Sequence, residues 1–171
     1  MNISTIVWII VIICVIIAII AFILVDTHIV MVKKGEVFSF KNAFNISGFP
    51  IITFQQRDAK GELHNYNFLV DTGSNATYIN RSAGMIYEPL DRKSEYMDSG
   101  GNNINCEIVN VELLLDNKKY KHEVRVGSFD ASFAEVKSTF GINLHGILGT
   151  NFMNAYKYVV DFKEYVVYAR K

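Results

Sequence analysis

The chain has 171 residues with 17 basic and 17 acidic side chains, so its formal net charge is zero. Every charged residue follows position 25, and the basic residues form no stripe that would track a nucleic-acid backbone. We therefore expect no nucleic-acid partner. The length predicts one folded domain in addition to any targeting segment.

An unbroken apolar run of 20 residues, positions 6–25, dominates the start of the chain. As a helix, such a run spans about 30 Å, the thickness of the hydrocarbon core of a bilayer. A cleaved signal peptide would carry a basic start and a small-residue cleavage site, and neither is present. We expect residues 1–26 to form a single-pass transmembrane anchor. Residues 27–47 would then be a tether, with one short strand near 37–40.

The sequence indicates the side of the membrane on which the soluble domain lies less clearly than it indicates the anchor. Lys33, Lys34 and Lys41 follow the apolar run, which favours a cytoplasmic soluble domain under the positive-inside rule. However, Asp26 lies nearest to the membrane, and short amino-terminal tails occur on either side. Cysteine usage does not decide the compartment, because Cys106 is alone in the soluble part and no intramolecular disulfide is expected.

A second feature is an apolar strand that ends in Asp71-Thr72-Gly73-Ser74. A carboxylate at the end of an apolar strand is costly to bury, and such positions are often functional. The tetrapeptide alone is also ordinary turn chemistry. Its context is more specific, because residues 76–79 return to strand-forming types and residues 146–153 later place two aliphatics and a glycine before a short helix.

These two elements, in this order, resemble the active-site loop and the supporting segment of retropepsin-like aspartic proteases. The resemblance covers residues 48–170 and implies a mainly β fold, a closed β-barrel with one or two short helices, over a domain of residues 48–171. It implies that Asp71 is the catalytic acid and that Thr72 and Gly73 brace the loop and let a second loop approach. Ser74 would donate a hydrogen bond to the carboxylate. The residues expected to lie beneath the loop are Ile147, Leu148 and Gly149.

Residues 96–104 have the composition of a hairpin tip, and similar chains carry a mobile flap here, with Gly100 and Gly101 as its flexible positions. The triplet Asp98-Ser99-Gly100 is a possible second acid loop. No apolar strand leads into Asp98, so turn chemistry explains the triplet better.

Hydrolysis by this chemistry needs two carboxylates around one water, and the chain supplies one. We therefore expect a C2 homodimer in which two copies of Asp71 meet on the axis, with residues 165–169 as a candidate interface strand. His64, His122 and His145 lack the spacing of metal ligands, so we expect no metal and no other cofactor.

The sequence thus predicts a membrane-anchored aspartic endopeptidase that acts on peptide or protein substrates. The alternative is a catalytically inactive retropepsin-fold module that binds extended peptides or mediates dimerisation. A structural protein of a phage or cell envelope is a third possibility that the sequence leaves open.

Overall fold

Strands dominate the computed structural model, which describes residues 15–17, 34–97, 101 and 103–170. This confirms the mainly β fold class. The elements of the described chain are β1 (Lys34–Ser39), α2 (Lys41–Ser47), β2 (Ile51–Arg57), β3 (Leu63–Val70), β4 (Tyr78–Asn80), a 3₁₀ turn (Arg81–Ala83), β5 (Glu88–Met97), β6 (Asn103–Leu115), β7 (Lys118–Gly127), α3 (Asp130–Phe140), β8 (Gly146–Leu148), α4 (Thr150–Tyr156), β9 (Tyr158–Asp161) and β10 (Val166–Arg170).

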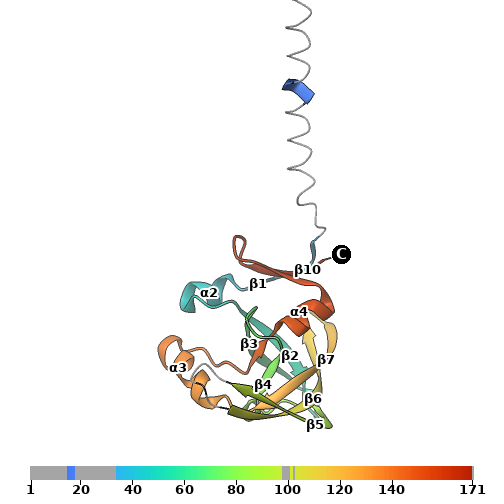
Figure 1. Ribbon diagram of the computed structural model, residues 1–171, viewed down its shortest axis with the longest axis vertical. Coiled ribbons are helices and arrows are strands. Elements are labelled where there is room, and N and C mark those ends of the chain that lie inside the picture. The colour runs from blue at the N-terminus through green and yellow to red at the C-terminus, as the bar shows by residue number, and fades with distance from the viewer. Residues whose placement is uncertain (1–14, 18–33, 98–100, 102, 171) are drawn as a thin grey trace, which may run out of the picture. The chain divides into compact units, whose positions relative to one another are not determined.

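The larger sheet has the strand order β2-β3-β8-β4-β7-β6-β5, and β2 also pairs with β6 where Gln55 faces Leu114. The sheet therefore closes on itself, and β5 lies outside the closure (Figure 1). Alternate side chains fill its interior, as the strand period requires: Tyr66, Phe68 and Val70 of β3 are all buried. This closed sheet is the body on which the candidate site is built.

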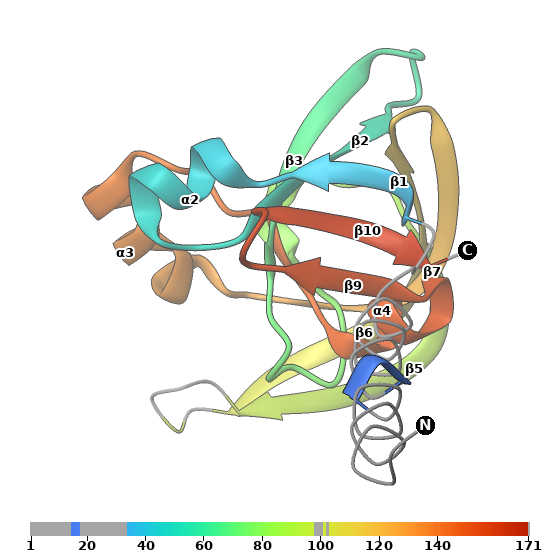
Figure 2. The same cartoon turned by 90° about the horizontal axis from the view of Figure 1, so that it is seen from above.

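A smaller sheet has the order β1-β10-β9 (Figure 2). The expected tether at 27–47 differs from the structure here, because β1 and α2 belong to the compact unit 35–170. The reason is burial of an aromatic side chain: Phe40 is 1% exposed and packs its ring against Phe44, Phe162 and Tyr165. The expected strand near 37–40 corresponds to the end of β1.

The position of β10 corrects the expectation that residues 165–169 form the interface between copies. β10 is the central strand of the small sheet, with β1 on one edge and β9 on the other. Its register with β9 runs from Val166 opposite Asp161 to Ala169 opposite Tyr158. Since both edges of β10 are already paired within the chain, it has no free edge to offer to a second copy.

The folded unit 35–170 has three α-helices among its described residues, where one or two short helices were expected in the domain. The additional helix is α2, which follows the buried Phe40 and ends at Gly48 in the left-handed conformation. Helix α3 is followed by Gly141, which is also left-handed. Helix α4 begins at Thr150 and is the short helix expected after the two aliphatics and the glycine of residues 147–149.

The predicted anchor at 6–25 lies outside the described residues except for 15–17, which are helical. Among the residues that are described, no helix has both the length and the apolar character needed to span a bilayer. The anchor therefore stays a prediction from the sequence.

Candidate active site

The Asp71 loop, residues 71–74, follows the apolar end of β3. The backbone N–H of Asp71 donates to the carbonyl of Leu148 at 3.0 Å, and the N–H of Gly73 donates to Oδ1 of Asp71 at 2.8 Å. Asp71 is half-buried, whereas Thr72 and Gly73 are exposed. The loop thus holds one oxygen of the carboxylate and leaves the rest of the turn open to solvent.

Strand β8 supports this loop from beneath. It runs parallel to β3, with Val70 opposite Leu148, and antiparallel to β4, with Tyr78 opposite Ile147. Ile147 and Leu148 are buried at 8% and 1% exposure. The structure therefore brings together the two segments that the sequence analysis paired, although they lie more than seventy residues apart.

The beginning of α4 fixes the far side of the loop. Both the backbone N–H and the hydroxyl of Thr150 donate to the carbonyl of Ser74, at 2.8 and 3.0 Å. Together with the bond from Asp71 to Leu148, these bonds hold the loop at its first and last residues. Such double attachment limits the movement of the carboxylate between them.

Thr77 is a supporting residue that the sequence analysis did not single out. Its side chain is fully buried, accepts a hydrogen bond from the Gly149 N–H at 3.2 Å and donates to Oδ1 of Asn151 at 2.8 Å. A buried hydroxyl requires such partners. The sequence feature that could have indicated this role is the position of Thr77 within the apolar run 76–79.

Ser74 differs from its expected role. Its hydroxyl donates to the carbonyl of Ala76 at 2.8 Å and not to the carboxylate of Asp71. The Gly73 N–H already occupies Oδ1, and the turn directs the short Ser74 side chain forward along the chain. Ser74 therefore shapes the exit of the loop rather than the charge of the acid.

The expected flap corresponds to the hairpin of β5 and β6, in which Tyr96 faces Ile104 and Met97 faces Asn103. Gly101 has a φ of 81°, which favours glycine, while Gly100 and the triplet 98–100 lie outside the described residues. The ring of Tyr96 contacts Tyr78 of β4 at 4.6 Å. The hairpin is therefore in contact, near its turn, with the strand that follows the Asp71 loop.

His145, the residue before β8, is joined to β3 by two hydrogen bonds. The backbone N–H of Asn67 donates to Nδ1 of His145 at 3.0 Å, and the backbone N–H of His145 donates to the carbonyl of Asn67 at 2.8 Å. Because Nδ1 accepts a hydrogen bond, the ring is neutral with its proton on Nε2. Burial lowers the pKa of His145, in agreement with this neutral form.

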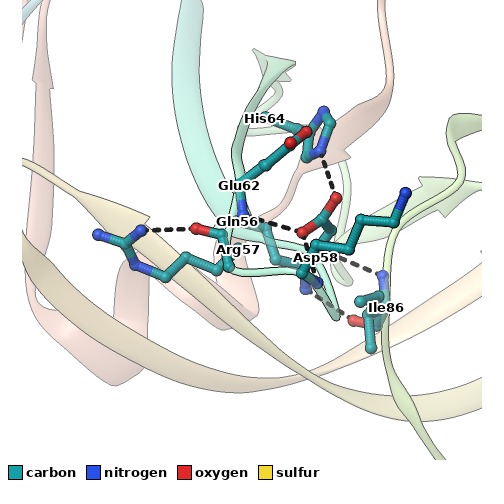
Figure 3. A network of polar contacts seen from close by, with 8 residues as sticks. Gln56, Arg57, Asp58, Glu62, His64 and Ile86 are labelled. Carbon is teal, nitrogen blue, oxygen red and sulfur yellow. Dashed lines mark hydrogen bonds and ion pairs between the residues drawn. The ribbon is translucent and has the colours of Figure 1, made fainter.

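A separate polar cluster lies at the other end of β3, in the turn after β2 (Figure 3). Asp58, Glu62 and His64 each place one potential metal-ligand atom within 4.8 Å of the others, an arrangement that the spacing of the histidines did not suggest. Asp58 accepts hydrogen bonds from the N–H groups of Lys60 and Glu62 and from His64. The bond from His64 lowers the pKa of Asp58. These contacts are those of a closed hairpin turn.

No family model matches the sequence, and no curated protein matches it. Among solved structures, EIAV protease complexed with the inhibitor HBY-793 is 17% identical with a TM-score of 0.43, over 65% of this chain and 90% of that one. A retropepsin-like aspartic protease from Rickettsia conorii is 16% identical with a TM-score of 0.39, over 68% and 97%. The retroviral protease-like domain of Ddi1 from Leishmania major is 13% identical with a TM-score of 0.40, over 65% and 80%. At this level of similarity, the chemistry has to be inferred from the loop itself.

Replacing Gly149 with alanine should destabilise the protein by about 2–3 kcal/mol, because the new Cβ would lie 2.1 Å from the carbonyl oxygen of Ala76 and backbone would have to move. Chemical denaturation measures this loss. Gly73→Ala is the matched control, since its Cβ would meet only Oδ1 of Asp71, at 3.2 Å. Equal stability of the two variants would show that the contact between Gly149 and Ala76 does not hold the loop.

The neutral ring of His145 predicts a loss of stability in mild acid. Its pKa is lower in the folded state than the usual value of about 6.5, so its contribution is complete above that pH. The contribution then declines as the pH falls from there to the lowered folded pKa, with a slope of at most about 1.4 kcal/mol per pH unit. The free energy of unfolding, measured from pH 7.5 to 5, should fall less steeply in His145→Gln than in the wild type. Identical slopes would rule out this role.

Proposed function

We propose that the chain is a retropepsin-like aspartic endopeptidase whose catalytic pair consists of Asp71 from each of two copies. The observation that supports this most directly is the attachment of the Asp71 loop to β8 and α4. The loop is held at both ends by hydrogen bonds from or to backbone groups, and Thr72 and Gly73 between those ends are exposed. A carboxylate presented in this way is placed to act on a bound molecule.

One copy supplies half of the chemistry. The hydrogen-bond partners of Asp71 among the described residues are backbone groups, at Gly73, Ser74 and Leu148. None of them is a second carboxylic acid. A second copy related by a twofold axis would bring an identical acid to the same place, and the exposed Gly73 offers no side chain that would keep the two loops apart.

The reaction follows from two carboxyl groups that share one proton. The ionised carboxylate takes a proton from a water molecule, whose oxygen attacks the carbonyl carbon of the scissile peptide. The protonated carboxyl group donates its proton to the carbonyl oxygen, which gives a tetrahedral diol. This intermediate collapses when a proton passes to the amide nitrogen and the C–N bond breaks.

Membrane anchoring through residues 6–25 belongs to this proposal. The support for it is the length and the unbroken apolar character of the run. Confinement of chains to one surface raises their effective concentration and favours pairing without stronger contacts. The substrates would be extended peptides or protein segments that reach the soluble domain near that surface.

The non-catalytic alternative predicts that the same fold holds peptides without cleaving them. It shares the loop and the hairpin of β5 and β6 with the enzyme, so the two functions differ only in the chemistry of Asp71. A single substitution can separate them.

Replacement of Asp71 by asparagine should reduce peptide cleavage by about 10²–10⁴-fold, because the proton donor and acceptor are lost. The stability should change little, since the asparagine oxygen can still accept the Gly73 N–H. Cleavage of a peptide library by the full chain, with products identified by mass spectrometry, measures the effect. Asp116→Asn is the control, because Asp116 is an exposed turn residue. Undiminished cleavage by the Asp71 variant would refute the assignment, and peptide binding without cleavage by the wild type would favour the binding module.

A further inference from the structure

Three apolar side chains are exposed around the end of α2. Ile46 is 62% exposed, and Phe49 is 36% exposed just after the left-handed turn at Gly48. Phe162, in the turn between β9 and β10, is 52% exposed and contacts the rings of Phe40 and Phe44. We call Ile46, Phe49 and Phe162 the α2 surface. Large exposed apolar groups gathered near one element are typical of a surface that another molecule covers.

The α2 surface adjoins the Asp71 loop through Phe49. The antiparallel register of β2 and β3 ends with Ile51 opposite Leu69, and the Val70 N–H then donates to the carbonyl of Pro50 at 2.8 Å. Phe49 and Asp71 are the next residues on the two segments, at the same end of this strand pair. The Phe49 ring also packs edge-on against Phe140 of α3, with 5.9 Å between centroids.

The elements around this surface project to one side of the folded unit. In Figure 2, α2 and α3 lie to the left of the sheets, and the hairpin of β5 and β6 also points to the left. Met97 is itself 65% exposed. A molecule that covers the α2 surface would also lie beside the Asp71 loop, since Phe49 and Asp71 follow the paired ends of β2 and β3.

The last strand, β10, is already paired on both sides within the chain. β10 is enclosed by β1 and β9, and β1 is joined to the barrel because the Tyr120 hydroxyl donates to Glu36 at 3.2 Å. β10 therefore has no edge left on which another chain could add a strand.

We propose that a second copy of this chain docks on the α2 surface, so that the interface between copies runs beside the Asp71 loop and is not formed by the terminal strands. This inference rests on the proposed function, because the need for a second Asp71 identifies the occupant. Under twofold symmetry the same surface serves both copies, and Phe49 lies nearest the axis since it adjoins Asp71. Ile46 and Phe162 lie farther out and widen the buried area.

The test uses a double variant of the full chain that carries both Ile46→Ser and Phe49→Ser. The control is the single variant Leu63→Ser. Leu63 is 44% exposed and begins β3, at the end opposite to Asp71, so its loss should not affect docking. Energy transfer between donor- and acceptor-labelled chains during dilution gives the dissociation constant, and thermal unfolding gives the stability. We expect the dissociation constant of the double variant to be at least about tenfold higher than that of the wild type. This corresponds to a loss of about 1.4 kcal/mol or more in the free energy of association. Its cleavage activity should return at high protein concentration, and Leu63→Ser should match the wild type.

A wild-type dissociation constant in the folded double variant would overturn the proposed interface while leaving the enzyme proposal intact, provided that the wild type is active and dimeric. Full activity in Asp71→Asn, or in a wild type that is monomeric at the assay concentration, would instead overturn the proposed function. If the double variant does not fold, Phe162→Ser takes its place, because this side chain lies in an exposed turn. An unchanged dissociation constant in that variant would likewise overturn the interface.

Discussion

The candidate site depends on a small set of hydrogen bonds between two segments that are distant in sequence. The Asp71 N–H donates to the carbonyl of Leu148, and the carbonyl of Ser74 accepts two hydrogen bonds from Thr150. Each such bond contributes only about 1 kcal/mol in net terms, yet together they fix both ends of a four-residue loop. The position of the carboxylate is therefore a property of β8 and α4 as much as of the loop.

Close packing makes these bonds possible. Gly149 approaches the backbone of Ala76 so closely that no side chain fits between them, and the buried hydroxyl of Thr77 provides a partner for the Gly149 N–H in the same place. A glycine and a short hydroxyl residue let two backbones meet without leaving polar groups unpaired. Close packing also explains the glycine at position 146, because a side chain there would collide with the Phe68 ring and the Tyr78 carbonyl.

The sequence predicted the parts of this arrangement that are encoded locally. An apolar strand before Asp71, a turn at Gly73 and the later segment 146–149 can each be read from neighbouring residues. The fold of residues 34–47 could not, because Phe40 is buried by Phe162 and Tyr165, more than a hundred residues away. The acceptor of the Ser74 hydroxyl depends on the exact course of the turn, which composition does not specify. For the same reason, the pairing of β10 on both edges was visible only in the structure.

The central claim is that each copy contributes one acid to a shared site. Mixing wild-type chains with increasing amounts of Asp71→Asn chains, under conditions that allow exchange, tests it directly. If the site needs Asp71 from both copies, cleavage per wild-type chain should fall in proportion to the wild-type fraction, because mixed pairs are inactive. Cleavage per wild-type chain that stays constant across the whole series would show that one chain holds a complete site, and would contradict the claim.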